Sequence, residues 1–520
     1  MHGGLGMGVV RPVAFAAIVG AAVVPVAAHP PAAAAPSDHA DGCRLLAVDG
    51  TTTTDRDAPT APGRVRPDDT VRVDLTRPVG PVNHDLTGVV WNAGSSVAPL
   101  APVHPTMVRI DASLQDRSRG PGQVDLQPLL QRVAQVRAIG AEPLVLLSYM
   151  PRWLGEPRAM GTQDPTRMGP GDLDAWQDLV TQVVRTLATA PQPAYRFEVW
   201  NEPDIPIFWQ DTPEQFVAMA LRTHQAVADV ARETGRPLQI GGPAAAFGLN
   251  ANMLRYLSSV ADAGLPIDFV TWHNYANFPF LGPDGPEGNL PEELYRLLAR
   301  RNPDSTPLRY SAEIADIRAK VDAALAGSSL SPDLIIDEWN VSAGGYDVRH
   351  DTAEGASLVA GILVEMERAG LDAAAFYRAV SGGDDRVGDW GLVHADGTGK
   401  PSWWVFRAWW AMTGTRLRTS GDDATTGLWA RATRDGGCVS VLLANFVATG
   451  APARSVEVDL DGPLPQCRGK RTTTLAALDG SSTTLADAHT VRLLARRTVT
   501  VQMASQSVAL PRTACDPAMT

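Results

Sequence analysis

The sequence has few cysteines, four among 520 residues, and fewer basic than acidic residues, 45 against 57. The net charge of −12 argues against a general nucleic-acid binder, which presents a basic face. No C-x-x-C spacing occurs, so neither a zinc ribbon nor a thioredoxin-like motif is expected. The chain also lacks the G-x-S-x-G of serine esterases, the H-E-x-x-H of zinc proteases and a P-loop. These absences remove several common classes of enzyme and binding protein.

Long apolar runs are also rare. The one at residues 13–28 follows Arg11 and ends in small residues. It is short for a membrane span and predicts a cleaved signal peptide at residues 1–28. An uncleaved N-terminal anchor is the alternative. We therefore expect a secreted protein with no membrane attachment after cleavage.

An even number of cysteines in an exported protein predicts disulfides, here two. Four cysteines allow three connectivities. We favour Cys438–Cys467, because both residues lie in the same C-terminal region, and this leaves Cys43–Cys515 to tie the termini together.

The length exceeds that of one ordinary domain, and a barrel with a smaller second domain is a natural partition. Residues 29–68 are rich in Pro, Ala, Thr and Asp and are expected to form a linker or loop. Within residues 69–411, eight short apolar runs have the character of buried parallel strands. The runs are Leu86–Trp91, Met107–Ile110, Pro143–Ser148, Phe197–Trp200, Leu238–Gly241, Phe269–Trp272, Asp333–Ile336 and Ala373–Tyr377.

Helical patterns stand between these runs. One spans residues 126–136 and stops at Gly140, a second begins at the capping sequence Thr212 to Gln215, and a third spans residues 352–368. Strands alternating with helices predict an α/β fold, a (β/α)₈ TIM barrel, with an open doubly wound sheet as the alternative.

Residues 412–520 differ in character from the rest. They contain strand patterns at 428–432, 439–445, 455–460 and 498–503, and no helical pattern. We expect a β-sandwich-like accessory domain here, with the strand pattern at residues 70–75 as a candidate member.

Acidic residues follow the fourth and seventh predicted strands, where the active site of a barrel lies. Glu202 follows the fourth strand and Glu338 the seventh. Two carboxylates that face one cavity are what glycoside hydrolysis needs. A salt-bridged loop carboxylate is the alternative for either residue alone. Asp337 is expected to point away from Glu338, because side chains alternate along a strand.

These motifs resemble glycoside hydrolase family 39, which includes β-xylosidases and α-L-iduronidases and falls in the clan of (β/α)₈ glycosidases with glutamates on strands four and seven. The likeness covers most of residues 80–410. It rests on F-E-V-W-N-E-P-D at 197–204 with F-W at 208–209, on D-F-V-T-W-H-N-Y at 268–275, and on G-L-V at 391–393 with D-G at 396–397 and K-P at 400–401.

The resemblance implies that Glu202 is the acid/base and Glu338 the nucleophile. It further implies that Asn201 hydrogen-bonds the sugar 2-hydroxyl, and that His273 and Tyr275 line the floor, with Tyr275 able to donate to Glu338. The alternatives are a core aromatic for Tyr275 and a structural role for His273.

Arg109, at the end of the second strand, is a candidate to orient Glu338 or the sugar, with a barrel salt bridge as the alternative. Four tryptophans fall in predicted loops at strand ends, and aromatic faces stack on sugars. The four tryptophans are Trp153, Trp209, Trp339 and Trp390. We expect two of them to touch substrate.

The sequence thus predicts a secreted retaining glycoside hydrolase acting on an oligosaccharide or polysaccharide, with a β-xylosidase-like activity as the first candidate. The alternative is a barrel that binds carbohydrate without cleaving it, and the intact glutamate pair counts against that. The mechanism requires no metal or cofactor. The sugar, exo or endo action and the oligomeric state are left open.

Overall fold

A computed structural model describes residues 68–92, 96–156, 163–277, 306–343, 347–464, 471–480, 489–491 and 497–515. The predicted signal peptide, Cys43 and Cys467 lie outside these ranges, so the signal peptide and both disulfide pairings stay predictions. Among the described residues, no helix is long and apolar enough to cross a membrane.

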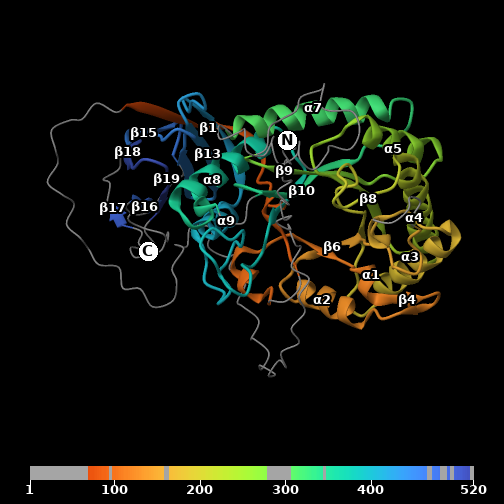
Figure 1. The fold of residues 1–520 in the computed structure, drawn as a ribbon. Helices are drawn as coiled ribbons and strands as arrows, with labels where there is room; N and C mark the ends of the chain where they lie inside the picture. The colour runs from red at the N-terminus through yellow and green to blue at the C-terminus, as the bar shows by residue number, and fades with distance from the viewer. Residues whose placement is uncertain are drawn as a thin grey trace, which may run out of the picture. The chain divides into compact units, whose positions relative to one another are not determined.

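Eight parallel strands form a closed barrel in the order β10-β11-β2-β3-β6-β7-β8-β9, which confirms the predicted TIM barrel and excludes an open sheet (Figure 1). The barrel strands are β2 (Gly88–Val90), β3 (Met107–Asp111), β6 (Glu142–Leu147), β7 (Arg196–Val199), β8 (Gln239–Ala245), β9 (Phe269–Tyr275), β10 (Asp333–Asn340) and β11 (Ala373–Tyr377). Each of them lies on one of the predicted apolar runs. Their side chains are buried almost throughout, because one face fills the barrel and the other packs on helices.

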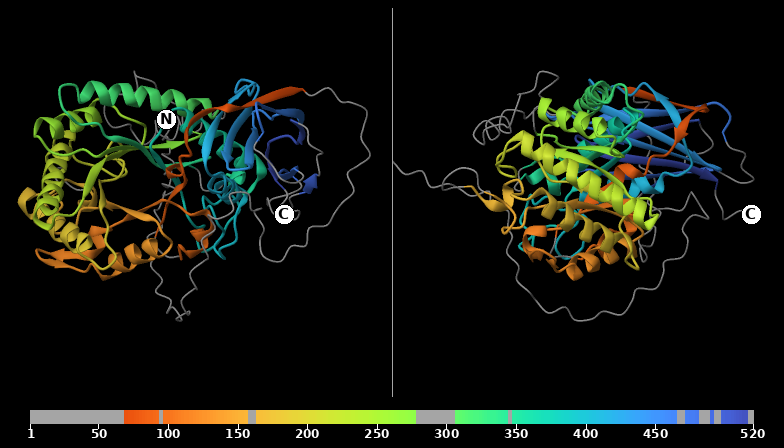
Figure 2. Two further views of the ribbon diagram at one scale, coloured as in Figure 1. Left: turned by 180° about the vertical axis from the view of Figure 1, so that it is seen from behind. Right: turned by 90° about the vertical axis from the view of Figure 1, so that its right-hand side faces the viewer.

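Helices connect the barrel strands and form its outer layer, as seen from behind in Figure 2. They are α1 (Leu114–Arg117), α2 (Gln127–Ala138), α3 (Leu173–Ala188), α4 (Pro213–Thr234), α5 (Ala251–Asp262), α7 (Leu308–Ala324), α8 (Ala353–Arg368) and α9 (Pro401–Ala411). The predicted cap of α4 is present: the Thr212 hydroxyl accepts a hydrogen bond from the Gln215 amide at 3.2 Å. A short 3-10 helix, Ala98–Val103, stands between β2 and β3.

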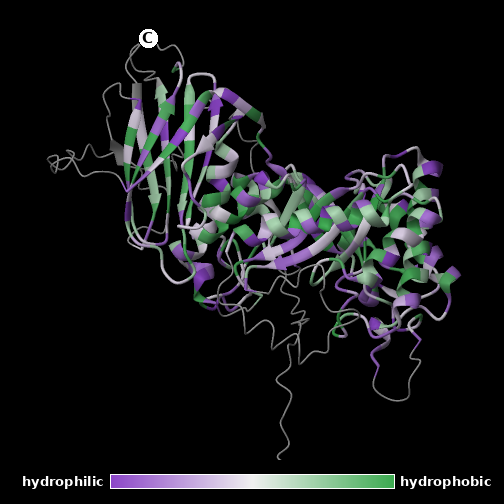
Figure 3. Cartoon of the chain, turned by 90° about the horizontal axis from the view of Figure 1, so that it is seen from above, coloured by the Kyte–Doolittle hydropathy of each residue, from purple (hydrophilic) through white to green (hydrophobic). Residues whose placement is uncertain are grey.

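A mostly-sheet region accompanies the barrel, as predicted. Nine strands pair in the order β17-β16-β19-β14-β13-β12-β1-β15-β18. They are β1 (Asp69–Pro81), β12 (Thr415–Ser420), β13 (Leu428–Asp435), β14 (Cys438–Asn445), β15 (Arg454–Asp461), β16 (Arg471–Leu478), β17 (His489–Val491), β18 (Thr498–Met503) and β19 (Ser507–Cys515). Hydrophobic and hydrophilic segments alternate along these strands (Figure 3). A small hairpin of β4 (Ser118–Gly120) and β5 (Gln123–Val124) follows α1.

Helix α8 joins the barrel to the sheet, and nearly all of its side chains are buried because it packs on both. The Glu367 carboxylate accepts hydrogen bonds from Arg431 of β13 at 2.8 and 3.1 Å, and Arg416 of β12 lies 3.5 Å away. The Arg431 guanidinium also stacks on Trp409 of α9, 3.8 Å from the ring centroid. A buried, charge-paired contact therefore fixes the sheet to the barrel.

Removing Glu367 leaves the buried Arg431 guanidinium without its counter-charge. Glu367→Ala is expected to lower the free energy of unfolding by about 3–5 kcal/mol, measured by urea denaturation. The matched control is Glu233→Ala, which breaks an exposed pair with Arg185 at 2.6 Å and should change stability little. Equal small losses in both variants would contradict a structural role for the Glu367 contact.

His224 of α4 is a second buried polar link between elements. Its Nδ1 lies 2.7 Å from the Pro266 carbonyl oxygen and its Nε2 lies 2.7 Å from the Tyr256 hydroxyl of α5. The neutral ring satisfies both contacts, with Nδ1–H donating and Nε2 accepting. Burial lowers the pKa of His224 to about 4.

Because the folded pKa is depressed, His224 supports stability above its unfolded value of about 6.5, and this support is lost as pH falls towards 4. His224→Gln should therefore flatten the loss of stability between pH 6.5 and 4, by at most about 3 kcal/mol. Chemical denaturation at a series of pH values measures this. Parallel slopes for variant and wild type across that window would refute it, whereas above pH 6.5 the slopes should coincide.

Candidate active site

The two predicted catalytic glutamates reach the same mouth of the barrel by different backbone routes. Strand β7 ends at Val199, and the chain then turns through positive φ angles of 59° at Trp200 and 45° at Glu202. The Glu202 amide donates to the Ala244 carbonyl at 2.9 Å, which holds this turn against β8. Glu338, in contrast, lies within β10 itself.

A β-bulge in β10 corrects one expectation. The register between β10 and β9 shifts between Ile336 and Glu338, so strict alternation fails at this point. Asp337 and Glu338 consequently face the same cluster: Arg109 contacts both, at 2.9 and 3.2 Å. The prediction that Asp337 points away from Glu338 is wrong.

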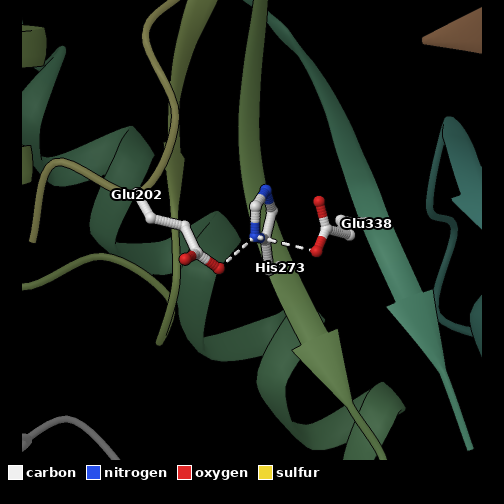
Figure 4. A group of neighbouring side chains, drawn as sticks. All are labelled: Glu202, His273 and Glu338. Carbon is white, nitrogen blue, oxygen red and sulfur yellow. Dashed lines mark hydrogen bonds and ion pairs between the residues drawn. The ribbon is translucent and has the colours of Figure 1, made fainter. Parts of the chain in front are cut away.

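His273 of β9 stands between the two glutamates (Figure 4). Its Nδ1 is 2.7 Å from Glu202 Oε1 and 3.8 Å from Glu338 Oε1. One oxygen of each carboxylate and a His273 nitrogen lie within 4.8 Å of one another. Both glutamate side chains are about nine-tenths buried, with 11% and 12% of their surface exposed.

The surroundings of the two carboxylates differ. Burial raises the pKa of Glu202 above its ordinary value, although His273 opposes the shift. Glu338 instead accepts hydrogen bonds from the Tyr275 hydroxyl and from Arg109, the latter at 3.2 Å. The site therefore favours a protonated Glu202, whereas two donors orient the Glu338 carboxylate.

Arg109 of β3 is the hub beneath this pair. Its Nε lies 2.6 Å from Glu198 and 2.9 Å from Asp337, and its Nη2 donates to Asn201 Oδ1 at 3.0 Å. Burial disfavours its charge, but Glu198, Asp337 and Glu338 outweigh that effect and raise the pKa of Arg109. Arg109 thus contacts Glu338 and also forms the barrel salt bridge that was the alternative.

Three residues near the pair escaped the sequence analysis: Glu198, Tyr149 and Tyr377. Burial raises the pKa of Glu198 to about 8, and a glutamate inside an apolar strand was itself a signal. Tyr149 packs edge-on to Trp200, with ring centroids 5.4 Å apart, and Tyr377 packs edge-on to Tyr275 at 6.2 Å. Both tyrosines follow or end barrel strands, so the strand-end rule could have found them.

The four tryptophans divide into two groups. Trp209 and Trp339 are almost completely buried. Trp209 packs edge-on to Trp200 at 5.1 Å, and Trp339 packs edge-on to Phe376 at the same distance. Their burial removes Trp209 and Trp339 as substrate-binding candidates, which leaves Trp153 and Trp390 for the prediction that two of the four tryptophans touch substrate.

Trp153 and Trp390 are partly exposed. Trp153 donates to Ser118 of the β4–β5 hairpin at 3.1 Å, and Trp390 donates to the Ser342 carbonyl at 3.1 Å. The Trp390 ring lies edge-on to Tyr377 at 5.7 Å, next to the Glu338 side of the site. Their contacts with a sugar, like that of Asn201, stay predictions.

The spacing of Glu202, His273 and Glu338 would also suit a metal ion, although the sequence shows no metal-ligand motif. The atoms that would bind it already have partners: His273 Nδ1 contacts Glu202 Oε1 at 2.7 Å, and Glu338 Oε1 accepts from the Tyr275 hydroxyl. We therefore interpret the three residues as an acid–base cluster.

Comparison with known proteins agrees with this geometry. The sequence model of "Glycosyl hydrolases family 39" matches residues 130–284. A β-xylosidase of Geobacillus stearothermophilus is 25% identical over 354 residues, 63% of this chain and 63% of that protein. The match thus spans less than two thirds of that relative.

Solved structures establish the likeness of the fold. A glucosidase from Croceicoccus marinus superposes with a TM-score of 0.66 at 19% identity, covering 86% of this chain and 99% of that chain. A monomeric β-xylosidase from Caulobacter crescentus CB15 gives 0.65 at 19% identity, covering 86% and 100%. The chain therefore has the (β/α)₈ fold of these enzymes. Its sequence is similar to glycoside hydrolase family 39, which confirms the predicted resemblance.

The role of Arg109 can be tested through protein stability, without a substrate. Arg109→Met leaves buried carboxylates without their counter-charge and should lower the free energy of unfolding by at least about 3–5 kcal/mol. Adding Asp337→Asn removes the charge of one of those carboxylates, which Arg109 contacts at 2.9 Å, so the double variant should be more stable than Arg109→Met alone. Thermal and urea denaturation measure both, and a double variant that is less stable would show that Asp337 does not depend on Arg109.

Proposed function

We propose that this protein is a secreted retaining glycoside hydrolase that cleaves O-glycosidic bonds by double displacement, with Glu338 as nucleophile and Glu202 as acid/base. The observation that carries the proposal is the carboxylate pair itself, whose oxygens lie within 4.8 Å across the barrel mouth. Carboxyl groups about 5–5.5 Å apart leave no room for a water between them and the sugar, which favours retention over inversion.

In the first step, Glu338 attacks the anomeric carbon and the glycosidic C–O bond breaks. The Tyr275 hydroxyl and Arg109 hold the Glu338 carboxylate in one orientation. The leaving oxygen takes the proton of Glu202, which burial keeps protonated. The products are a glycosyl-enzyme ester on Glu338, a released alcohol and a Glu202 carboxylate.

In the second step, the Glu202 carboxylate removes a proton from water. The water oxygen attacks the anomeric carbon and the ester bond to Glu338 breaks, which restores both glutamates. Two inversions give net retention. Asn201, held by Arg109 at 3.0 Å, is placed beside Glu202 to meet the sugar 2-hydroxyl.

For the sugar, we propose a β-xyloside-like substrate. Support comes from the Geobacillus β-xylosidase and from the Caulobacter β-xylosidase fold. Secretion rests on the apolar run at residues 13–28.

The test is hydrolysis of aryl β-xylosides, β-glucosides, α-L-arabinosides and α-L-iduronides by wild type, Glu338→Ala and Glu202→Ala. Glu338→Ala should be inactive, and azide should rescue it to give the glycosyl azide of inverted configuration. Glu202→Ala should lose about 10²–10⁴-fold in rate on poor leaving groups, much less on dinitrophenyl glycosides, and azide should give the retained product.

The contrast between the two azide products is the internal control, since it separates the two roles. Hydrolysis that persists in Glu338→Ala, or an inverted sugar from wild type, would refute the mechanism. Binding of xylo-oligosaccharides without cleavage of any substrate would favour a non-catalytic carbohydrate-binding barrel.

A further inference from the structure

Asp337 is a buried carboxylate with no part in the two catalytic steps above. It is fully buried. Two ion pairs hold it, to Arg109 Nε at 2.9 Å and to His273 Nε2 at 3.4 Å, and the Glu198 side chain also hydrogen-bonds to it. The bulge after Ile336 turns it towards these partners.

His273 therefore has a different carboxylate at each ring nitrogen. Nε2 faces Asp337, and Nδ1 faces Glu202 at 2.7 Å. An ionised carboxylate can only accept, so Asp337 keeps a hydrogen on Nε2 in both the neutral and the charged ring. Nδ1 is then the position that gains or loses a proton, and it does so against Glu202 Oε1.

The charges around His273 balance when the ring is positive. The groups that face it or the same cluster are Glu202 and Asp204 after β7, Glu198 on β7, Asp337 and Glu338 on β10, and Arg109 on β3. Burial favours the protonated forms of Glu198, Glu202 and Asp204, raising their pKa values. This leaves two anions, Asp337 and Glu338, against two cations, Arg109 and His273.

The pKa shifts of Asp337 and His273 agree with this balance of two anions and two cations. Burial opposes ionisation of Asp337, but Arg109 and His273 outweigh it and lower the pKa of Asp337. Burial likewise opposes the charge on His273, but Glu338 and Asp337 outweigh it and raise the pKa of His273 well above its ordinary value.

We propose that Asp337 is a positioning residue that, through His273, controls the proton shared between His273 Nδ1 and Glu202. The part of this proposal that concerns catalysis rests on the glycosidase function proposed above. When Glu202 gives its proton to the leaving oxygen, its new carboxylate accepts a hydrogen bond from the positive His273. When Glu202 takes a proton from water in the second step, the original state returns, and His273 neither gains nor loses a proton over the cycle.

The direct test is ¹⁵N NMR of histidine-labelled full-length protein, with the His273 signal assigned by its loss in His273→Asn. In wild type, Nε2 should carry a hydrogen at every pH. In Asp337→Asn, the His273 pKa should fall by about one unit or more. Glu198→Gln is the matched control: Glu198 does not face a His273 nitrogen, burial favours its protonated form, and the glutamine amide can still donate to Asp337. This variant should shift the His273 pKa much less.

The wild-type measurement alone can overturn the proposal, even if Asp337→Asn does not fold. A neutral His273 with hydrogen on Nδ1 and a bare Nε2 contradicts it. So does a His273 pKa that is the same in wild type and Asp337→Asn. These readouts need no substrate, so they are independent of whether a glycoside is cleaved.

The kinetic test uses kcat/KM against pH. The basic limb of this profile reports deprotonation of the general acid, Glu202. A positive His273 favours ionised Glu202, so losing that charge in Asp337→Asn should raise the Glu202 pKa and move the basic limb to higher pH by about one unit. His273→Asn should shift it similarly, and the double variant should shift it no further than His273→Asn alone. A further shift in the double variant would show that Asp337 acts through Arg109 and would overturn the proposed route.

Discussion

A single buried guanidinium is the constraint on which the site depends. Arg109 touches Glu198, Asp337, Glu338 and Asn201, which come from the ends of strands on two sides of the barrel. Carboxylates this deep in a protein would otherwise repel one another or take up protons. The planar fork of arginine can meet several acceptors at fixed angles, which a lysine ammonium cannot. The positions and charges of the carboxylates at the barrel mouth therefore depend on Arg109, which lies beneath them.

Much of the fold followed from sequence patterns. The eight barrel strands fell on the predicted apolar runs because strands buried on both faces leave a continuous hydrophobic signature. Glu202 and Glu338 could be placed because parallel strands in a barrel present their carboxyl ends at one mouth. In the sheet region, β12, β16, β17 and β19 escaped prediction.

The errors at the site share one cause, which is that sequence periodicity assumes regular backbone. Asp337 was misplaced because a bulge breaks alternation between Ile336 and Glu338. Trp339 was taken for a loop residue, yet β10 continues through Asn340 and carries its ring into the outer core. Trp209 was misjudged for a related reason, since the turn after β7 buries it against Trp200 and Phe216. A bulge or turn depends on tertiary contacts, so local pattern does not reveal it.

The position of β1 has a consequence for how the chain is made. Asp69–Pro81 pairs in parallel with β15 and antiparallel with β12, so the interior of the sheet contains a strand that precedes the whole barrel in the sequence. The barrel strands can pair with neighbours as each emerges from the ribosome, but β1 must wait for partners translated more than three hundred residues later. During synthesis β1 is thus an exposed, unpaired strand, and its charged and proline residues, such as Arg72 and Pro78, suit it to remain soluble until the sheet closes.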